Sequence, residues 1–162
     1  MMQPSQVQIL TPGDVACAQR GDRLETLLGS CVAVVLTDPR RTIAAMCHIV
    51  HVSPSTCQME KAGADAAGAF AGMFKLLRER GIDPKQCVAY VYGGGNLFPD
   101  VPTNLDVGQR NAAWVLDELN RCGIQVLEQN LGGFAYRRLR WTVGPAPPEV
   151  TVVSVSNDAP VS

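Results

Sequence analysis

Cys31 and His48 have the residue types and spacing that suit thiol chemistry. Cys31 follows Gly29 and Ser30 and opens a continuously apolar run, and a glycine lets nearby backbone N–H groups approach a substrate oxygen closely. Such N–H groups stabilise the oxyanion of a tetrahedral intermediate. A thiolate can attack a carbonyl carbon while an adjacent imidazole transfers the protons. The alternative is that Cys31 is a small buried hydrophobe that begins a core strand, which is the usual setting of a free cysteine.

A β-hairpin is the element that would bring this pair together. Residues 31–36 are short, apolar and β-branched, 42–50 read as a returning strand, and 38–41 form a turn. A turn centred within 38–41 would pair Cys31 directly with His48, and opposed Cβ atoms lie about 4.5–5.5 Å apart. A neighbouring imidazolium would then lower the pKa of the thiol and favour the thiolate. The alternative for His48 is a hydrogen-bonded core histidine.

The remaining pattern predicts an α+β fold of layered, mixed β-sheets, sandwich-like, with two main helices and about seven strands. Amphipathic helices are expected over 65–80 and 106–122, each with an aspartate N-cap and a glycine just after its end. The further strand segments are 6–10, 87–92, 124–128, 139–143 and 150–155. We expect residues 1–155 to form a single domain and 156–162 a flexible tail.

Composition argues against several classes of protein. The net charge is −1, so no broad basic field favours binding to nucleic acid. No apolar run approaches the roughly 20 residues that span a bilayer, and the N-terminus lacks the regions of a signal peptide. These features predict a cytoplasmic protein without membrane insertion.

No cofactor or metal is predicted. The six cysteines contain no C-x-x-C pair, which disfavours a zinc ribbon and a thioredoxin-like redox site. His51 with Cys47 or Cys57 has no recognisable metal-ligand spacing. The glycines at 93–95 match no nucleotide-binding motif, and we expect them to pack beside the site.

Several segments together, in this order and spacing, resemble the chemoreceptor glutamine deamidase family, CheD. The first is Thr26-Leu-Leu-Gly-Ser-Cys-Val-Ala-Val34, which resembles the nucleophile motif, and the second is Ala45-Met-Cys-His48. The later segments are 64–65, 93–98, 107–111, 131–133 and 137–138. The resemblance extends from about residue 7 to residue 143.

The resemblance implies hydrolysis of glutamine side chains on methyl-accepting chemotaxis receptors to glutamate and ammonia. Cys31 would be the nucleophile and His48 the general base, with Gly29 and Ser30 at the oxyanion. Thr26 is the nearest candidate for the third polar member, and Glu25 is the alternative. The implied fold resembles that of Cys–His toxin deamidases. The implied partners are the cytoplasmic helical region of the receptors and a CheC-type phosphatase.

Two other functions stay open from the sequence. One is a non-catalytic or weakly catalytic binding partner that regulates a CheC-type phosphatase. The other is a transglutaminase-like acyltransferase, which would incorporate an amine instead of hydrolysing the thioester. The segment after His48 reads Ile-Val-His51-Val52 where the family usually has H-x-x-L-P, and this departure leaves the choice of substrate open.

Overall fold

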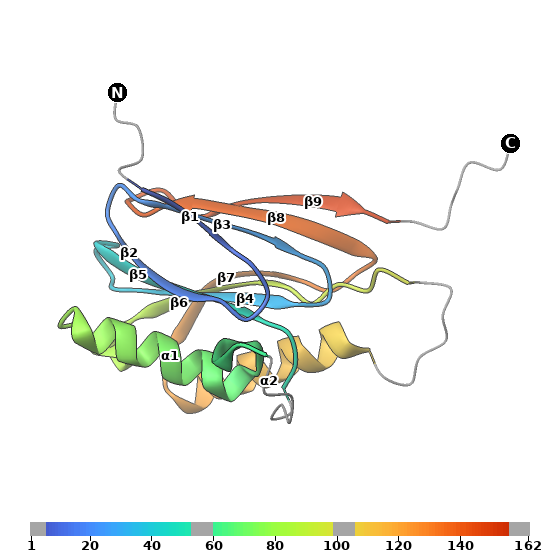
Figure 1. The fold of residues 1–162 in the computed structure, drawn as a ribbon, viewed down its shortest axis with the longest axis horizontal. Coiled ribbons are helices and arrows are strands. Elements are labelled where there is room, and N and C mark those ends of the chain that lie inside the picture. The colour runs from blue at the N-terminus through green and yellow to red at the C-terminus, as the bar shows by residue number, and fades with distance from the viewer. Residues whose placement is uncertain (1–5, 53–59, 99–105, 156–162) are drawn as a thin grey trace, which may run out of the picture.

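The computed structural model describes residues 6–52, 60–98 and 106–155. Within them, two β-sheets lie face to face and two helices cover the outer face of one sheet (Figure 1). This three-layer arrangement confirms the predicted α+β sandwich with two main helices. The predicted tail 156–162 and Cys57 lie outside the described residues.

The four-stranded sheet has the order β1-β3-β8-β9, and the five-stranded sheet has the order β2-β5-β4-β6-β7. The strands are β1 Val7–Leu10, β2 Val15–Gln19, β3 Arg23–Leu28, β4 Val32–Thr37, β5 Ile43–Ile49, β6 Val88–Gly93, β7 Gln125–Leu131, β8 Ala135–Thr142 and β9 Glu149–Ser154. The helices are α1 Ala66–Glu79 and α2 Val107–Arg121, with short 3-10 turns η1 Ala62–Ala64 and η2 Pro84–Gln86.

Burial along the strands follows from these layers. Every residue of β4 is buried, because this strand lies between β5 and β6 with the other sheet on one face and the helices on the other. In β8, buried residues alternate with more exposed ones, because the outer face of the four-stranded sheet meets solvent. The continuous apolar run predicted as a buried strand is therefore the central strand of the larger sheet.

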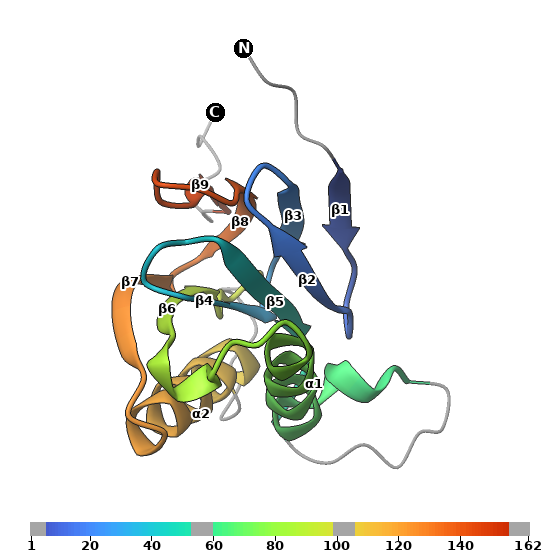
Figure 2. The ribbon, with the colours of Figure 1, turned by 90° about the vertical axis from the view of Figure 1, so that its left-hand side faces the viewer.

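The two helices lie side by side under the five-stranded sheet (Figure 2). Their predicted caps are confirmed: Asp65 accepts from the N–H of Gly68 at 3.1 Å, and Asp106 accepts from the N–H of Gln109 at 3.0 Å. The glycines that follow the helices have left-handed φ angles. Gly81 has a φ of +78° and Gly123 one of +72°. Each helix thus begins and ends where its local sequence dictates.

The hairpin of β4 and β5 forms, but its predicted register is wrong by two residues. Ala33, and not Cys31, lies opposite His48. The connection is longer than the predicted turn because the Asp38 carboxylate accepts the N–H groups of Thr42 at 2.8 Å and Ile43 at 2.9 Å. These bonds occupy residues that the predicted register would have paired across the strands.

Three strand assignments also differ from the prediction. Neither β2 nor β3 was predicted as a strand, and β8 begins at Ala135 instead of residue 139. β3 pairs in parallel with β1 and antiparallel with β8, so it lies inside the smaller sheet. Its C-terminal end leads directly through Gly29 into β4 of the other sheet. This crossing between the sheets places Cys31 at one end of the sandwich.

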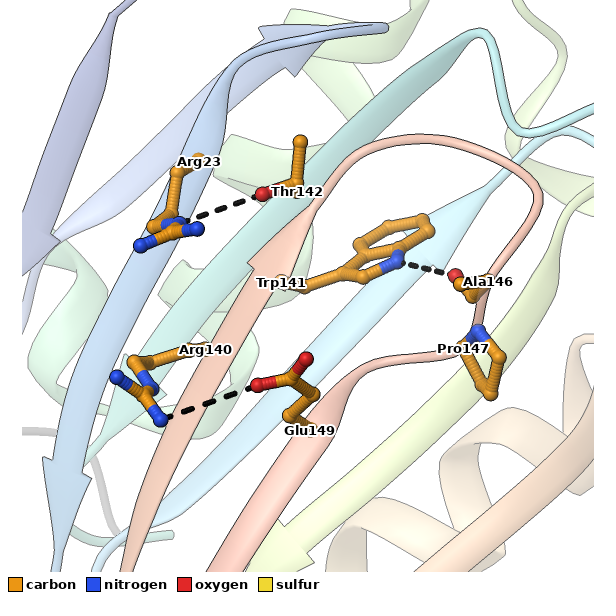
Figure 3. A pocket seen from close by; sticks show the side chains of 7 residues that line it. All are labelled: Arg23, Arg140, Trp141, Thr142, Ala146, Pro147 and Glu149. Atoms are coloured by element: carbon orange, nitrogen blue, oxygen red, sulfur yellow. Dashed lines mark hydrogen bonds and ion pairs between the residues drawn. The ribbon is translucent and has the colours of Figure 1, made fainter. Parts of the chain in front are cut away.

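A small pocket of about 80 Å³ lies at the opposite end of β3 (Figure 3). The indole N–H of Trp141 donates to the carbonyl of Ala146 at 2.7 Å, and Arg140 lies 3.8 Å from Glu149. Arg23 Nε donates to the hydroxyl of Thr142 at 3.3 Å. These polar groups bond to one another and hold the connection between β8 and β9, so we assign the pocket a structural role.

Candidate active site

Cys31 lies in the crossing from β3 to β4 and is half-buried against the apolar layer between the sheets. Its carbonyl accepts the N–H of Gly94 at 2.9 Å, and the carbonyl of Gly29 accepts the N–H of Gly95 at 2.9 Å. Gly93 lies so close that a Cβ there would collide with the carbonyl oxygen of Cys31. Residues 93–95, which we call the glycine turn, therefore pack directly on the segment that carries the thiol, as the sequence predicted.

His48 faces the space between the sheets and is 2% exposed. Its Nδ1 lies 2.8 Å from Thr26 Oγ1, and the same hydroxyl donates to the carbonyl of Leu10 at 2.8 Å. A hydroxyl has one proton to donate. Because Thr26 donates that proton to the Leu10 carbonyl, its Oγ1 accepts a hydrogen bond from Nδ1–H of His48. The Nε2 atom of His48 is then the unprotonated nitrogen, which can accept a proton from a nucleophile.

Thr26, and not Glu25, is the residue of this pair that faces the site. Successive residues of a strand point to opposite faces. Thr26 is 5% exposed and points inward between Leu24 and Leu28. Glu25 lies on the outer face of the sheet, opposite Arg140.

Cys31 and His48 lie on the same face of the five-stranded sheet. Ala33 is directly opposite His48, and Cys31 precedes Ala33 by two residues, so it is the diagonal neighbour of His48. Such diagonal neighbours have Cα atoms about 7–8 Å apart, and their side chains can meet. The shifted register changes a direct pair into a diagonal one but keeps both side chains on one face.

Burial disfavours the charged forms of both groups. It lowers the pKa of His48 to about 4, an effect that the charge of Asp14 partly offsets and that of Lys61 reinforces. It also raises the pKa of the Cys31 thiol. The resting pair at neutral pH is therefore thiol and neutral imidazole, whereas the sequence led us to expect a thiolate.

Asn111 is a buried polar residue to which the sequence assigned no role, although it belongs to segment 107–111 of the family resemblance. It lies on α2, is 1% exposed, and bonds to backbone carbonyls of the segments that carry Cys31 and His48. Its signal in the sequence is its position on the apolar stripe of α2, with Gly108, Ala112 and Val115.

Exposed apolar side chains lie on the segments next to the crossing that carries Cys31. The Leu97 side chain lies against Gly29, and the N–H of Asn96 donates to the carbonyl of Gly133 at 2.9 Å. These contacts bring residues 96–98 beside the turn before Phe134. Phe98 is 68% exposed and Phe134 is 52% exposed. We call Leu97, Phe98 and Phe134 the apolar rim.

His51 lies away from the pair and bonds through Nε2 to the Glu60 carboxylate at 2.8 Å. Within residues 6–52, 60–98 and 106–155, no group of three or more His, Cys, Asp or Glu side chains is placed to hold a metal ion. In the same part of the chain, no helix is both long and apolar enough to cross a membrane.

Comparison with known proteins assigns the chain to a class concerned with chemotactic signalling. Residues 53–146 match the model of the family described as CheD chemotactic sensory transduction. A probable chemoreceptor glutamine deamidase of Albidiferax ferrireducens is 33% identical over 138 residues, which cover 83% of this chain and 80% of that protein. A second such protein, from Desulforamulus reducens, is 32% identical over 89% of this chain and 88% of its own. A third, from Methanococcus vannielii, is 31% identical over 75% of this chain and 79% of its own. The chain belongs to the CheD family.

Proposed function

We propose that this chain is a protein-glutamine deamidase that converts glutamine side chains of methyl-accepting chemotaxis receptors to glutamate and releases ammonia. Membership in the CheD family supports the activity, and three relatives are named probable chemoreceptor glutamine deamidases. The observation that carries the assignment of the site is the hydrogen bond between Thr26 and His48, beside Cys31. That bond leaves one imidazole nitrogen ready to accept a proton on the face that also carries the thiol.

The reaction proposed for this site begins with the neutral pair. His48 Nε2 takes the thiol proton as Cys31 Sγ attacks the glutamine Cδ, and the carbonyl oxygen becomes an oxyanion. Backbone N–H groups at Ser30 and Cys31 would stabilise that oxyanion. The carbon–nitrogen bond then breaks, Nε2–H protonates the leaving amide nitrogen, and ammonia departs. A thioester between Cys31 and the substrate remains.

Hydrolysis of the thioester uses the same two groups. His48 Nε2 takes a proton from water as the oxygen attacks the thioester carbon. The carbon–sulfur bond breaks, and the sulfur recovers a proton from the imidazolium. The product is a glutamic acid side chain, which ionises to glutamate by releasing a proton to solvent, and both protein groups return to their neutral forms. Every step is carried by residues of this chain and water.

The substrate of this proposal is the cytoplasmic helical region of the receptors, and a cytoplasmic location follows from it. The apolar rim supports a protein substrate, because exposed apolar side chains on segments next to the one that carries Cys31 favour contact with another protein surface. A CheC-type phosphatase is a further proposed partner, and it stays a prediction from the family resemblance.

The test measures the intact mass of receptor cytoplasmic fragments after incubation with wild type, Cys31→Ala and Cys17→Ala. Cys17 is a matched control because it is also a partly buried free cysteine, on β2. We expect fragments incubated with wild type or Cys17→Ala to gain about one mass unit per converted glutamine, with release of ammonia. Fragments incubated with Cys31→Ala should keep their mass.

Other outcomes would overturn the proposal. Unchanged fragments with wild type, while a CheC-type phosphatase still binds, would indicate a binding protein. Incorporation of an added amine in preference to water would indicate an acyltransferase. Full activity of Cys31→Ala would remove Cys31 from the reaction.

A further inference from the structure

We propose that Asn111 is a positioning residue that turns the backbone N–H of Cys31 toward the reacting carbonyl oxygen. This inference rests on the proposed deamidase function and adds a residue to its site. The Asn111 side chain acts from α2, beneath the sheet, through the peptide that joins Ser30 to Cys31. It does not touch the reacting atoms.

A single amide group joins the two segments of the site. Asn111 Nδ2 donates to the carbonyl of Ser30 at 3.2 Å and to the carbonyl of Val50 at 3.0 Å. The first acceptor immediately precedes Cys31, and the second follows His48 by two residues. An amide nitrogen carries two protons and can serve both carbonyls at once. Because Asn111 is 1% exposed, water cannot replace it there without a change in packing.

The bond to Ser30 fixes the direction of the next N–H group. In a trans peptide the C=O of one residue and the N–H of the next point in opposite directions, and the structure has no cis peptide among its described residues. With the Ser30 carbonyl aimed at α2, the N–H of Cys31 points away from the helices. That direction is the side of the sheet that faces Thr26 and His48.

The neighbouring strand leaves this N–H unused. A regular antiparallel pair would exchange two hydrogen bonds between Cys31 and Gly94. Gly94 donates to the carbonyl of Cys31 at 2.9 Å, but the return bond does not form between these described residues. Gly94 has a φ of +64°, and its carbonyl lies against Gly108 of α2. No other described residue accepts the Cys31 N–H, so it can donate to an oxyanion.

Gly108 explains why the helix can reach this peptide. A Cβ at Gly108 would collide with the carbonyl oxygens of Gly94 and Gly95. Without a side chain there, the first turn of α2 packs directly on the glycine turn. Asn111 lies three residues further along the helix and therefore on the same face. The helix, the glycine turn and the Ser30–Cys31 peptide form one packed unit.

The test compares Asn111→Ala with Val115→Ala, a matched control that removes a fully buried side chain from the same helix. Two rates are measured on each: deamidation of a receptor fragment and alkylation of Cys31 by iodoacetamide. Alkylation needs a reactive thiol but forms no oxyanion. We expect Asn111→Ala to lower kcat about 100-fold, as loss of an oxyanion donor does, with KM and the alkylation rate within about twofold. Val115→Ala should lower Tm but keep kcat within about twofold once folded.

A second variant covers the case in which Asn111→Ala does not fold. Asn111→Gln keeps both amide protons on a side chain one methylene longer, and we expect it to fold and to lose about 10-fold in kcat. Equal kcat losses in Asn111→Ala and Val115→Ala, or a parallel loss of alkylation and deamidation, would overturn the inference. So would wild-type kcat in Asn111→Gln together with an unfolded Asn111→Ala. Failure of the wild type to deamidate any fragment would instead contradict the proposed function.

Discussion

Thr26 Oγ1 lies 2.8 Å from Nδ1 of His48 and joins the two sheets at the end where Cys31 immediately precedes β4. The same hydroxyl donates to the Leu10 carbonyl, so it accepts from the imidazole and sets the tautomer of His48. A general base needs both an unprotonated nitrogen and a fixed ring. Thr26 holds the imidazole ring in place and determines which of its nitrogens is unprotonated.

Replacement of Thr26 should therefore act on kcat. We expect Thr26→Val, which keeps the shape but removes the acceptor, to lower kcat by about 10- to 100-fold with little change in KM. Thr26→Ser keeps the hydroxyl and should retain most of the activity. The measurement is steady-state deamidation of a receptor fragment. Equal activity of the Val and Ser variants would contradict the role given to the hydroxyl.

Acid should destabilise the folded protein through His48. Burial lowers the pKa of His48 from 6.5 to about 4, so between these values the unfolded chain binds a proton that the folded chain does not. The free energy of unfolding should thus be unaffected by this group above pH 6.5 and fall by about 3 kcal/mol as the pH drops to 4. Urea unfolding across this range gives the slope.

His48→Asn should remove this part of the pH dependence, whereas His51→Asn should keep it. His51 is a matched control because it is the other histidine of the chain and lies beside Glu60, outside the site. The same slope in wild type and His48→Asn would show that His48 is not the group responsible.

The contact between the glycine turn and Cys31 predicts a large effect of a single methyl group. A Cβ at Gly93 would collide with the carbonyl oxygen of Cys31, and the φ of +114° is itself strained for alanine. We expect Gly93→Ala to lower kcat more than 10-fold by displacing the thiol, since about 1 Å of misplacement can cost 100-fold. The measurement is the kinetics of deamidation by wild type and Gly93→Ala at a temperature where both proteins are folded.

Gly81→Ala separates backbone strain from the clash. Gly81 also has a left-handed φ, of +78°, but nothing lies within 4 Å of a Cβ there. This variant should lose about 1–2 kcal/mol of stability and keep its kcat. If Gly93→Ala kept wild-type kcat as well, the glycine turn would not position Cys31.

The apolar rim should contribute to substrate binding more than to chemistry. We expect Phe98→Ser and Phe134→Ser each to raise KM for a receptor fragment about 10-fold with kcat within about twofold, because exposed aromatic side chains often dominate binding. Ile9→Ser is the control, since Ile9 is 69% exposed on the outer face of the four-stranded sheet. A similar rise in KM for Ile9→Ser would show that the effect is not specific to the rim.

Local signals in the sequence predicted much of the fold. The helix caps at Asp65 and Asp106, and the buried strand that became β4, depend on short-range patterns that the structure keeps. β2 and β3 were missed because their burial depends on partners far away in sequence. The alternation of Leu24, Thr26 and Leu28 was nevertheless a signal that Thr26 faces inward.

The sequence predicted that the residues of the candidate site lie near one another, but not their register or their charge state. The side-chain bonds of Asp38 shift the hairpin by two residues, and turn length alone does not reveal them. Burial of His48 follows from the packing of two sheets, so its lowered pKa could not be read from neighbouring residues. Asn111 needed the contact between α2 and the glycine turn, which joins distant segments.

The most direct test of the proposed reaction is to trap the covalent intermediate on Cys31. A receptor fragment is mixed with the protein, quenched in acid within one turnover, and digested for mass spectrometry. We expect a thioester between Cys31 and a receptor glutamine, about 17 mass units lighter than the two peptides together because ammonia has left. This species should disappear as glutamate forms. Conversion of glutamine to glutamate at the wild-type rate by Cys31→Ala, with no thioester in the wild type, would contradict it.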